Sequence, residues 1–186
     1  YSAAPQLTID GRSKIVVMSD CHRGVGSVAD DFAKNRNVCY AALQSYFNEG
    51  YICIEAGDGD ELWKNKSFQD IASMHTDIFT LLARFYAGCR FIMLYGNHDI
   101  EKIYKPGLLD TYPALRGTHD TKLFPGLKAL EGVILTYTPT GRNIFIVHGH
   151  QADFFNDRLW QLARFLVRYV WRPLELVGFS DPKSAA

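Results

Sequence analysis

Residues 51–63 read Tyr-Ile-Cys-Ile-Glu-Ala-Gly-Asp-Gly-Asp-Glu-Leu-Trp, and the character of this stretch changes abruptly at Gly57. A short, mostly apolar run typical of a buried strand stops at the glycine and gives way to a cluster of acids. Carboxylates gathered at one strand end repel one another unless a positive charge lies among them. We therefore expect a metal ion at this point, with Asp58 as its central ligand.

Two further apolar runs end in the same way. Residues 14–19 lead into Asp20-Cys21-His22, and residues 90–95 lead into Gly96-Asn97-His98-Asp99. Their β-branched and apolar composition predicts strands that are buried on both faces, as in a parallel sheet.

The segments between these strands carry apolar residues at helical spacing. We expect one helix over 37–49 and a second over 68–85, which follows a capping-box sequence at 67–70. Strands that alternate with helices form right-handed parallel units, so the three polar strand ends should share one edge of the sheet. Ligands of open α/β sheets bind at that edge.

The pattern changes in the second half of the chain. Residues 103–130 contain several prolines and glycines and predict an irregular connection. Residues 133–137 and 143–147 then predict a hairpin, whose second strand ends in His148-Gly149-His150. The closing segment, about 156–177, is helical by period, and Pro173 should kink or interrupt it.

Length and composition limit the class of protein. A chain of 186 residues that is 47% hydrophobic suits a single domain over 1–186. Lysine plus arginine and aspartate plus glutamate number 20 each, which disfavours nucleic acid as a partner. Four cysteines without a Cys-x-x-Cys pair favour a reducing compartment, and we expect a cytoplasmic protein. No apolar stretch is long enough to span a bilayer.

Carboxylate, imidazole and amide groups meet at four strand ends. Each short motif is weak by itself, because a single histidine is more often structural than a ligand. Together they form a mixed donor set that suits manganese, iron or zinc, whereas calcium would not favour the imidazoles. The residues in this set are Asp20, His22, Asp58, Asn97, His98, His148 and His150.

The ordered motifs Asp20-x-His22, Gly57-Asp58, Gly96-Asn97-His98-Asp99 and His148 resemble those of the calcineurin-like metallophosphoesterases. The similarity covers about residues 14–150. It implies an α/β fold of the layered α/β/β/α type. It also implies hydrolysis of a phosphomonoester, phosphodiester or pyrophosphate bond by a hydroxide held between two divalent metals, with manganese expected and iron or zinc as alternatives.

The same resemblance implies a ligand set. Asp20 and His22 would hold one metal, Asn97 and His148 the other, and Asp58 would bridge both. A bridging anion is physically necessary because two cations roughly 3.5–4 Å apart repel each other strongly. Water activated by the metals can attack phosphorus directly, so no protein nucleophile is required.

Neighbouring residues are candidates for catalysis and substrate binding. His98 is placed to protonate or stabilise the leaving oxygen, and Asp99 either orients His98 or caps a helix that begins near Ile100. Arg23 either holds a phosphate oxygen or is a solvated loop charge. Asn97 is a candidate for both roles: we expect it to take part in catalysis and to contact the substrate.

Finer details resemble one branch of the family. Gly57-Asp58-x-x-Glu61-x-Trp63, His148-Gly149 and the polar pattern over 156–168 are similar to UDP-2,3-diacylglucosamine hydrolases, which cleave a pyrophosphate in a lipid precursor. That branch has arginine where His98 stands and aspartate where His150 stands. We therefore expect a relative that acts on a phosphorylated small molecule or lipid-linked substrate of its own.

The final family motif, Gly-His-x-His, is not met in full. Gly149-His150 resembles its beginning, which makes His150 a candidate ligand, but no histidine follows and Asp153 is a poor substitute. We expect the strands that carry this motif to lie beyond residue 186, in a longer protein. The competing hypothesis is a binding scaffold that kept the fold and lost the metal centre.

The segment 154–178 is a candidate helical cap or lid. Arg164, Arg168 and Arg172 recur every fourth residue, with leucines and aromatic residues between them. Three interpretations are open: a lid over the site, a peripheral membrane contact, or an ordinary amphipathic helix with a solvated basic face.

Overall fold

The computed structural model describes residues 4–105, 107–109, 122, 124–152 and 159–177. The strands are β1 (Gln6–Ile9), β2 (Ile15–Met18), β3 (Ile52–Ala56), β4 (Phe91–Leu94), β5 (Gly132–Tyr137) and β6 (Arg142–Val147). The α-helices are α1 (Arg36–Asn48), α2 (Phe68–Met74), α3 (Thr76–Ala87), α4 (Glu101–Tyr104), α6 (Trp160–Leu166) and α7 (Arg172–Leu176).

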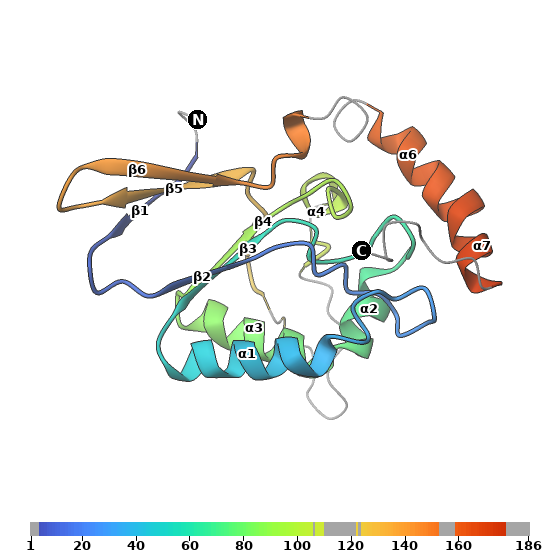
Figure 1. Ribbon diagram of the computed structural model, residues 1–186, viewed down its shortest axis with the longest axis horizontal. Coiled ribbons are helices and arrows are strands. Elements are labelled where there is room, and N and C mark those ends of the chain that lie inside the picture. The colour runs from blue at the N-terminus through green and yellow to red at the C-terminus, as the bar shows by residue number, and fades with distance from the viewer. Residues whose placement is uncertain (1–3, 106, 110–121, 123, 153–158, 178–186) are drawn as a thin grey trace.

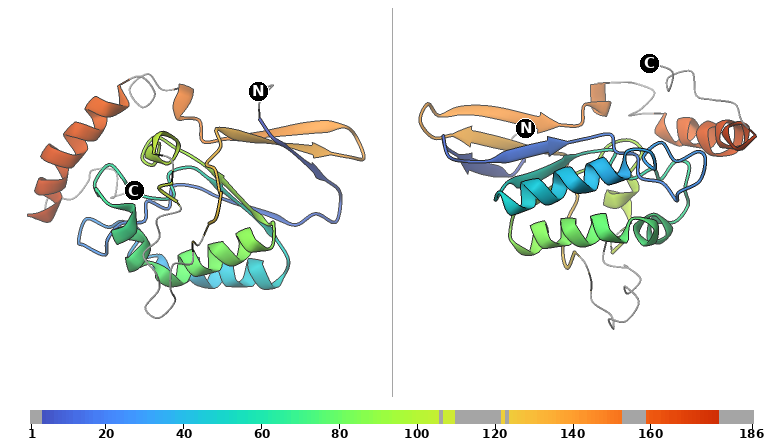
Figure 2. Two further views of the ribbon diagram at one scale, coloured as in Figure 1. Left: turned by 180° about the vertical axis from the view of Figure 1, so that it is seen from behind. Right: turned by 60° about the horizontal axis from the view of Figure 1, so that its bottom comes forward.

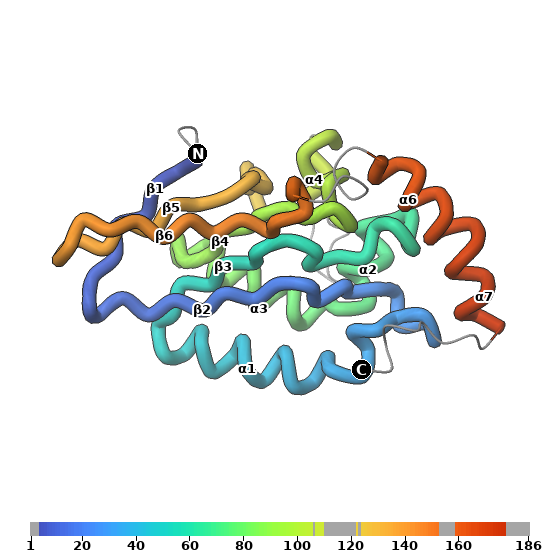
Figure 3. Tube along the Cα trace, turned by 45° about the horizontal axis from the view of Figure 1, so that its top comes forward, coloured from blue at the N-terminus to red at the C-terminus, as the bar shows by residue number. Residues whose placement is uncertain are grey.

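The first sheet is the parallel unit expected from the sequence. Its strand order is β2-β3-β4, with β3 in the centre and both pairings parallel. Helices α1 and α3 cover one face of this sheet (Figure 1). Since all three strands run in one direction, the residues that follow them converge at one end of the molecule, as Figure 3 shows.

The second sheet has the order β1-β5-β6 and lies over the other face of the first (Figure 2). The predicted hairpin is present as the antiparallel pair β5 and β6. Strand β1 was not anticipated, and it pairs in parallel with β5, which is far away in the sequence. It is only four residues long, so its alternating pattern is too short to identify it.

Side chains of the central strands alternate between two cores. Cys53, Phe91 and Met93 face the helices and join a cluster with α1 and α3. Ile54 and Leu94 face the second sheet and pack against Val133 and its neighbours. The α/β class is thus confirmed, and the described residues form a helical layer followed by two sheets.

The helix predictions for residues 68–85 and for the closing segment have different outcomes: the first requires correction, and in the second the α-helix is interrupted just before Pro173. The helix expected over 68–85 is interrupted at His75, whose φ and ψ of −114° and 39° leave the helical region, so α2 and α3 are separate. His75 is buried and lies 3.0 Å from the carbonyl oxygen of Gly24 through Nε2, an interaction that fixes the break. In the closing segment, Pro173 lies in the first turn of α7, after a π-helical turn at Val167–Trp171.

Candidate metal centre

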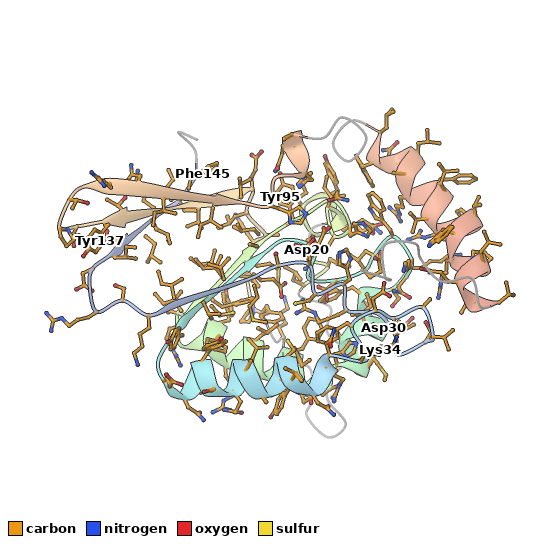
Figure 4. The ribbon with its side chains drawn as sticks, in the orientation of Figure 1. Asp20, Asp30, Lys34, Tyr95, Tyr137 and Phe145 are labelled. Carbon is orange, nitrogen blue, oxygen red and sulfur yellow. The ribbon has the colours of Figure 1, made fainter. Side chains whose placement is uncertain are left out.

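The loops that follow β2 and β3 continue the parallel pairing of these strands beyond the sheet. Backbone amides of Asp20, His22 and Arg23 donate to the carbonyls of Gly57, Asp58 and Gly59 at 3.1, 2.9 and 3.0 Å. These three bonds bring the Asp20-x-His22 motif alongside Asp58. Figure 4 shows Asp20 just beyond the sheet, at the same end as Tyr95.

The ligand candidates occupy an unusual backbone conformation. Asp20, His22 and Asp58 have φ angles of 53°, 49° and 51°. This left-handed region costs an L-residue roughly 1–2 kcal/mol, although aspartate tolerates it better than most residues. Strain of this kind persists only where the surrounding structure enforces it, and it is concentrated at functional sites.

The side chains of these residues form a compact donor set together with His148. His148 Nε2 is 3.3 Å from Asp58 Oδ2, and His22 Nε2 is 3.9 Å from the same oxygen and 3.8 Å from Asp20 Oδ1. Ligand bonds of about 2.0–2.2 Å separate two ligands of one ion by about 3–4 Å. Oxygen and imidazole donors at this spacing fit a borderline divalent metal such as manganese, iron or zinc.

Two glycines allow the donors to approach so closely. A Cβ added to Gly57 would lie 2.7 Å from the ring of His148, and one added to Gly96 would lie 2.1 Å from Asp58 Oδ1. The amide of His98 donates to the same oxygen at 2.8 Å. Asn97 is therefore held between two residues that touch Asp58, and it is buried beside the donor set.

His98 is held by Glu61, a residue that the sequence pointed to only as part of a motif resembling one branch of the family. Glu61 lies 2.9 Å from His98 Nδ1 through either carboxylate oxygen, and 3.2 Å from His22 Nδ1 through Oε2. The indole of Trp63 stacks on the His98 ring at 4.1 Å. The only signal for these contacts was the spacing Gly57-Asp58-x-x-Glu61-x-Trp63.

The electrostatics of the donor set favour cation binding. The hydrogen bond to Asp58 raises the pKa of His148 to about 9, so a proton occupies the place of a metal in the metal-free protein. Burial alone would raise the pKa of Asp58, but its bond to His148 and the charges of three nearby histidines lower it. Asp58 therefore stays ionised and negative.

Arg23 lies beneath the donor set, and neither of its predicted roles fits this position. Its side chain is 1% exposed, with Nε 2.8 Å from Asp60 Oδ1 and Nη1 2.8 Å from Glu55 Oε2. It is therefore not a solvated charge, and two nitrogens of its guanidinium, Nε and Nη1, are bonded to buried carboxylates and not available to a phosphate. The geometry favours a structural role.

Asp99 belongs to the same buried network. Its Oδ1 accepts from the Gly96 amide at 2.7 Å, and its Oδ2 accepts from the Gly59 amide at 3.1 Å and pairs with Lys102 Nζ at 2.6 Å. Its side chain bonds neither to His98 nor as a cap on α4, so neither of its predicted roles fits. Glu55, Asp60 and Asp99 lie close enough for a metal, but Lys102 and Arg23 already neutralise them.

His150 is set apart from the donor set. It begins a 3-10 turn (His150–Ala152), and its ring lies 5.5 Å from that of His148 and 5.6 Å from that of Tyr95. Among the described residues, the clusters of potential metal donors do not include it. Its role as a ligand remains a prediction, and Asp153 lies outside the described residues.

The closing helix, which comprises α6, the π-helical turn and α7, has an orientation that its sequence did not reveal. Arg168 donates to the carbonyls of Trp63, Leu62 and Asn65 at 2.8, 2.6 and 3.1 Å, and Arg164 pairs with Glu101. Its basic side therefore faces the protein. The apolar residues on its outward side include Leu162, Phe165, Leu166, Tyr169, Val170, Leu176 and Val177. No helix among the described residues has the length and hydropathy of a membrane span.

Comparison with known proteins decides the family. The sequence model of the calcineurin-like phosphoesterase family matches residues 13–184, which is nearly the whole chain. The chain belongs to the calcineurin-like phosphoesterase family. No curated protein and no solved structure gave a match. Membership implies a metal-dependent hydrolase that acts on phosphate esters, and the donor set around Asp58 agrees with that chemistry.

Proposed function

We propose that this calcineurin-like phosphoesterase hydrolyses a phosphate ester or pyrophosphate bond with two divalent metals. The observation that carries the proposal is the convergence of Asp20, Asp58 and His148, whose donor atoms lie within 4.8 Å of one another. The strained backbone at two of these residues supports a functional purpose, because a purely structural loop would relax.

The proposed roles of the side chains are those that the resemblance to the family implies. Asp20 and His22 would hold one ion, Asn97 and His148 the other, and Asp58 would serve both. When bound, such ions activate water and neutralise phosphoryl oxygens. His98, which is half-buried and stacks on Trp63, would donate a proton to the leaving oxygen. Manganese is the proposed metal, with iron and zinc as alternatives.

The decisive experiment replaces the central carboxylate. Asp58→Asn keeps the shape of the side chain but removes its charge, so we expect loss of metal binding and loss of hydrolysis of a generic aryl phosphate diester. Metal content is measured by elemental analysis after manganese loading. Wild-type protein that binds no metal and hydrolyses nothing would support the competing scaffold hypothesis instead.

We further propose that the substrate is lipid-linked and is reached at a membrane surface. The supporting observation is the orientation of the closing helix. Its Phe165 and Tyr169 are both 55% exposed, whereas Arg164 and Arg168 face the protein. Large apolar side chains exposed along one helix mark interaction surfaces, and interfacial helices bury such a face among lipid acyl chains. This proposal agrees with the likeness to UDP-2,3-diacylglucosamine hydrolases and with a cytoplasmic, peripheral location.

Vesicle flotation tests this second proposal. Wild-type protein should float with phosphatidylcholine vesicles, and the double variant Phe165→Ser with Tyr169→Ser should not. Ile144→Ser is the matched control, since Ile144 is 53% exposed on β6. A wild type that stays with the aqueous fraction, or that forms a dimer through this face, would contradict a membrane contact.

A further inference from the structure

A pocket outside the metal donor set lies beside helix α4. Residues of α4 and of the turn after it line one side, and residues 126–129, which lead towards β5, line the other. Its volume is about 440 Å³, and small-molecule sites occupy roughly 300–1,000 Å³. We propose that this pocket binds a small amphipathic anion, whose apolar body contacts the walls and whose acidic group pairs with lysine.

The walls of the pocket are mostly apolar. The apolar side chains that line it belong to Ile103, Leu108, Leu109, Leu127 and Ala129. Leu109 is buried in the core that α1 and α3 share with the first sheet, and Leu108, Leu127 and Ala129 pack against that core. A hydrocarbon group placed on these walls leaves water, and each buried methylene tightens binding by about four-fold. The body of the ligand is therefore apolar.

The charged side chains that line the pocket are all cationic. They are Lys102, Lys105 and Lys128, and no acid is among the described residues of the lining. Lys102 is already bonded to Asp99, and Lys105 pairs with Glu101. Lys128 is exposed and has no ion pair within the part of the chain that the structure describes. An ammonium group pairs well with a carboxylate or phosphate oxygen, so the acidic group of the ligand belongs at Lys128.

Backbone hydrogen bonds hold both sides of the pocket in place. On one side, the amides of Lys105 and Leu108 donate to the carbonyls of Glu101 and Lys105 at 3.0 and 3.1 Å. On the other, the amide of Leu130 donates to the Met93 carbonyl at 2.9 Å and fastens the end of the segment to β4. Because the walls are formed without a ligand, binding requires little ordering of the protein.

Three probes separate the two parts of the ligand. Octanoate has an apolar chain and a carboxylate, octanol has the chain alone, and acetate has the charge alone. Amide chemical shifts of metal-free wild-type protein show where each probe binds. Octanoate should shift amides of residues 102–105, 107–109 and 126–129, and should bind roughly 100-fold more tightly than acetate because methylenes are buried. Octanol, which lacks the charge, should bind about 10-fold more weakly than octanoate.

Two variants test the walls and the charge separately. Lys128→Glu reverses the charge at an exposed position, so octanoate affinity should fall by about 10-fold while octanol affinity stays unchanged. Ile103→Ser removes part of the wall at a side chain that is 36% exposed, and should weaken both probes. Lys34→Glu is the matched control: Lys34 is exposed near the start of α1 (Figure 4), outside the lining, and its variant should bind like the wild type.

The wild type alone can overturn the proposal. Octanoate that shifts no amide of the pocket, that binds no better than acetate, or that shifts only the closing helix or the metal centre would contradict it. Equal octanoate affinity in Lys128→Glu and wild type would also contradict it, as would equal losses in Lys128→Glu and Lys34→Glu. Since the protein is metal-free, the result is independent of the proposed phosphoesterase activity.

Discussion

At the scale of single residues, Gly96 makes the position of Asp58 possible. Alanine there would place a methyl group 2.1 Å from Asp58 Oδ1 and 2.7 Å from the Asp58 amide nitrogen. We expect Gly96→Ala to displace the carboxylate. Misplacing a catalytic group by about 1 Å can cost about 100-fold in rate, so we expect activity to fall by about that factor. Manganese titration and hydrolysis of an aryl phosphate diester measure the effect.

The control for this prediction is Gly11→Ala. The nearest atom to an added Cβ at Gly11 is the Tyr137 hydroxyl at 3.8 Å, which is ordinary contact. That variant should match the wild type. Normal manganese affinity in Gly96→Ala would show that the Asp58 carboxylate can move without loss.

Lys102 stabilises the acids beneath the metal centre. Its side chain is fully buried, with Nζ 2.6 Å from Asp99 Oδ2, 2.8 Å from Asp60 Oδ2 and 3.6 Å from Glu55 Oε1. Lys102→Met would leave these three carboxylates with Arg23 as their remaining cation in the network. Removing one partner of a buried ion pair costs about 3–5 kcal/mol, which we expect as the loss in free energy of unfolding by urea.

Lys105→Met is the matched control. Lys105 directly follows α4 and pairs with Glu101 of that helix, but its side chain is 55% exposed. A surface pair contributes at most about 1 kcal/mol. If both lysine variants lost the same stability, the buried network would not be the cause.

Sequence reasoning at this scale found the donor residues but assigned two of their neighbours incorrectly. Asp20, His22, Asp58 and His148 could be named because each follows an apolar run. The partners of Arg23 and Asp99 could not be named, because they depend on which loops lie side by side in three dimensions. Glu61 was visible only as a position in a spacing pattern.

At the scale of elements, the closing helix is fastened to the loop that carries Trp63. The guanidinium of Arg168 accounts for three hydrogen bonds to backbone carbonyls of that loop. Arg168→Met keeps the apolar stem and removes these donors. Hydrogen bonds to charged groups contribute about 1.5–3 kcal/mol, so we expect amide hydrogen exchange in residues 160–176 to accelerate by roughly 10- to 100-fold.

Arg12→Met is the control, because Arg12 is exposed in the turn before β2. Its exchange pattern over residues 160–176 should equal that of the wild type. Unchanged exchange in Arg168→Met would mean that the other contacts of the helix, such as Lys64 with Glu175, are sufficient to hold it.

Elements were predictable where the signal was local. The three parallel strands, the hairpin and helix α1 were identified from apolar periodicity and turn residues. Strand β1 escaped because its partner is distant in sequence, and the break at His75 escaped because a tertiary contact to Gly24 causes it. The closing helix has a basic side and an apolar side, and its sequence alone does not show which one faces the protein. That orientation depends on tertiary contacts of Arg164 and Arg168.

At the scale of the whole molecule, the donor set links metal content, pH and stability. The pKa of His148 is raised to about 9 by its bond to Asp58, against about 6.5 for histidine in an unfolded chain. Its contribution to stability is therefore fully present below pH 6.5 and is lost as the pH rises through 9. Metal-free wild type should lose more stability across this range than His148→Gln, as measured by urea unfolding with chelator.

The same proton should oppose metal binding. Because a metal and a proton compete for His148, manganese affinity should rise with pH up to about 9, and binding should release a proton. Calorimetry in two buffers of different ionisation enthalpy measures that proton. A pH-independent affinity would contradict the pairing of His148 with Asp58.

The left-handed backbone at Asp20 has a consequence for the evolution of this protein. Asp20 has a φ of 53° and a side chain that is 58% exposed, so glycine at this position would relieve roughly 1 kcal/mol of strain at little cost in contacts. Selection for thermal tolerance alone would therefore favour Asp20→Gly and discard a proposed ligand. Under the proposed ligand role, aspartate at this position would trade stability for metal binding.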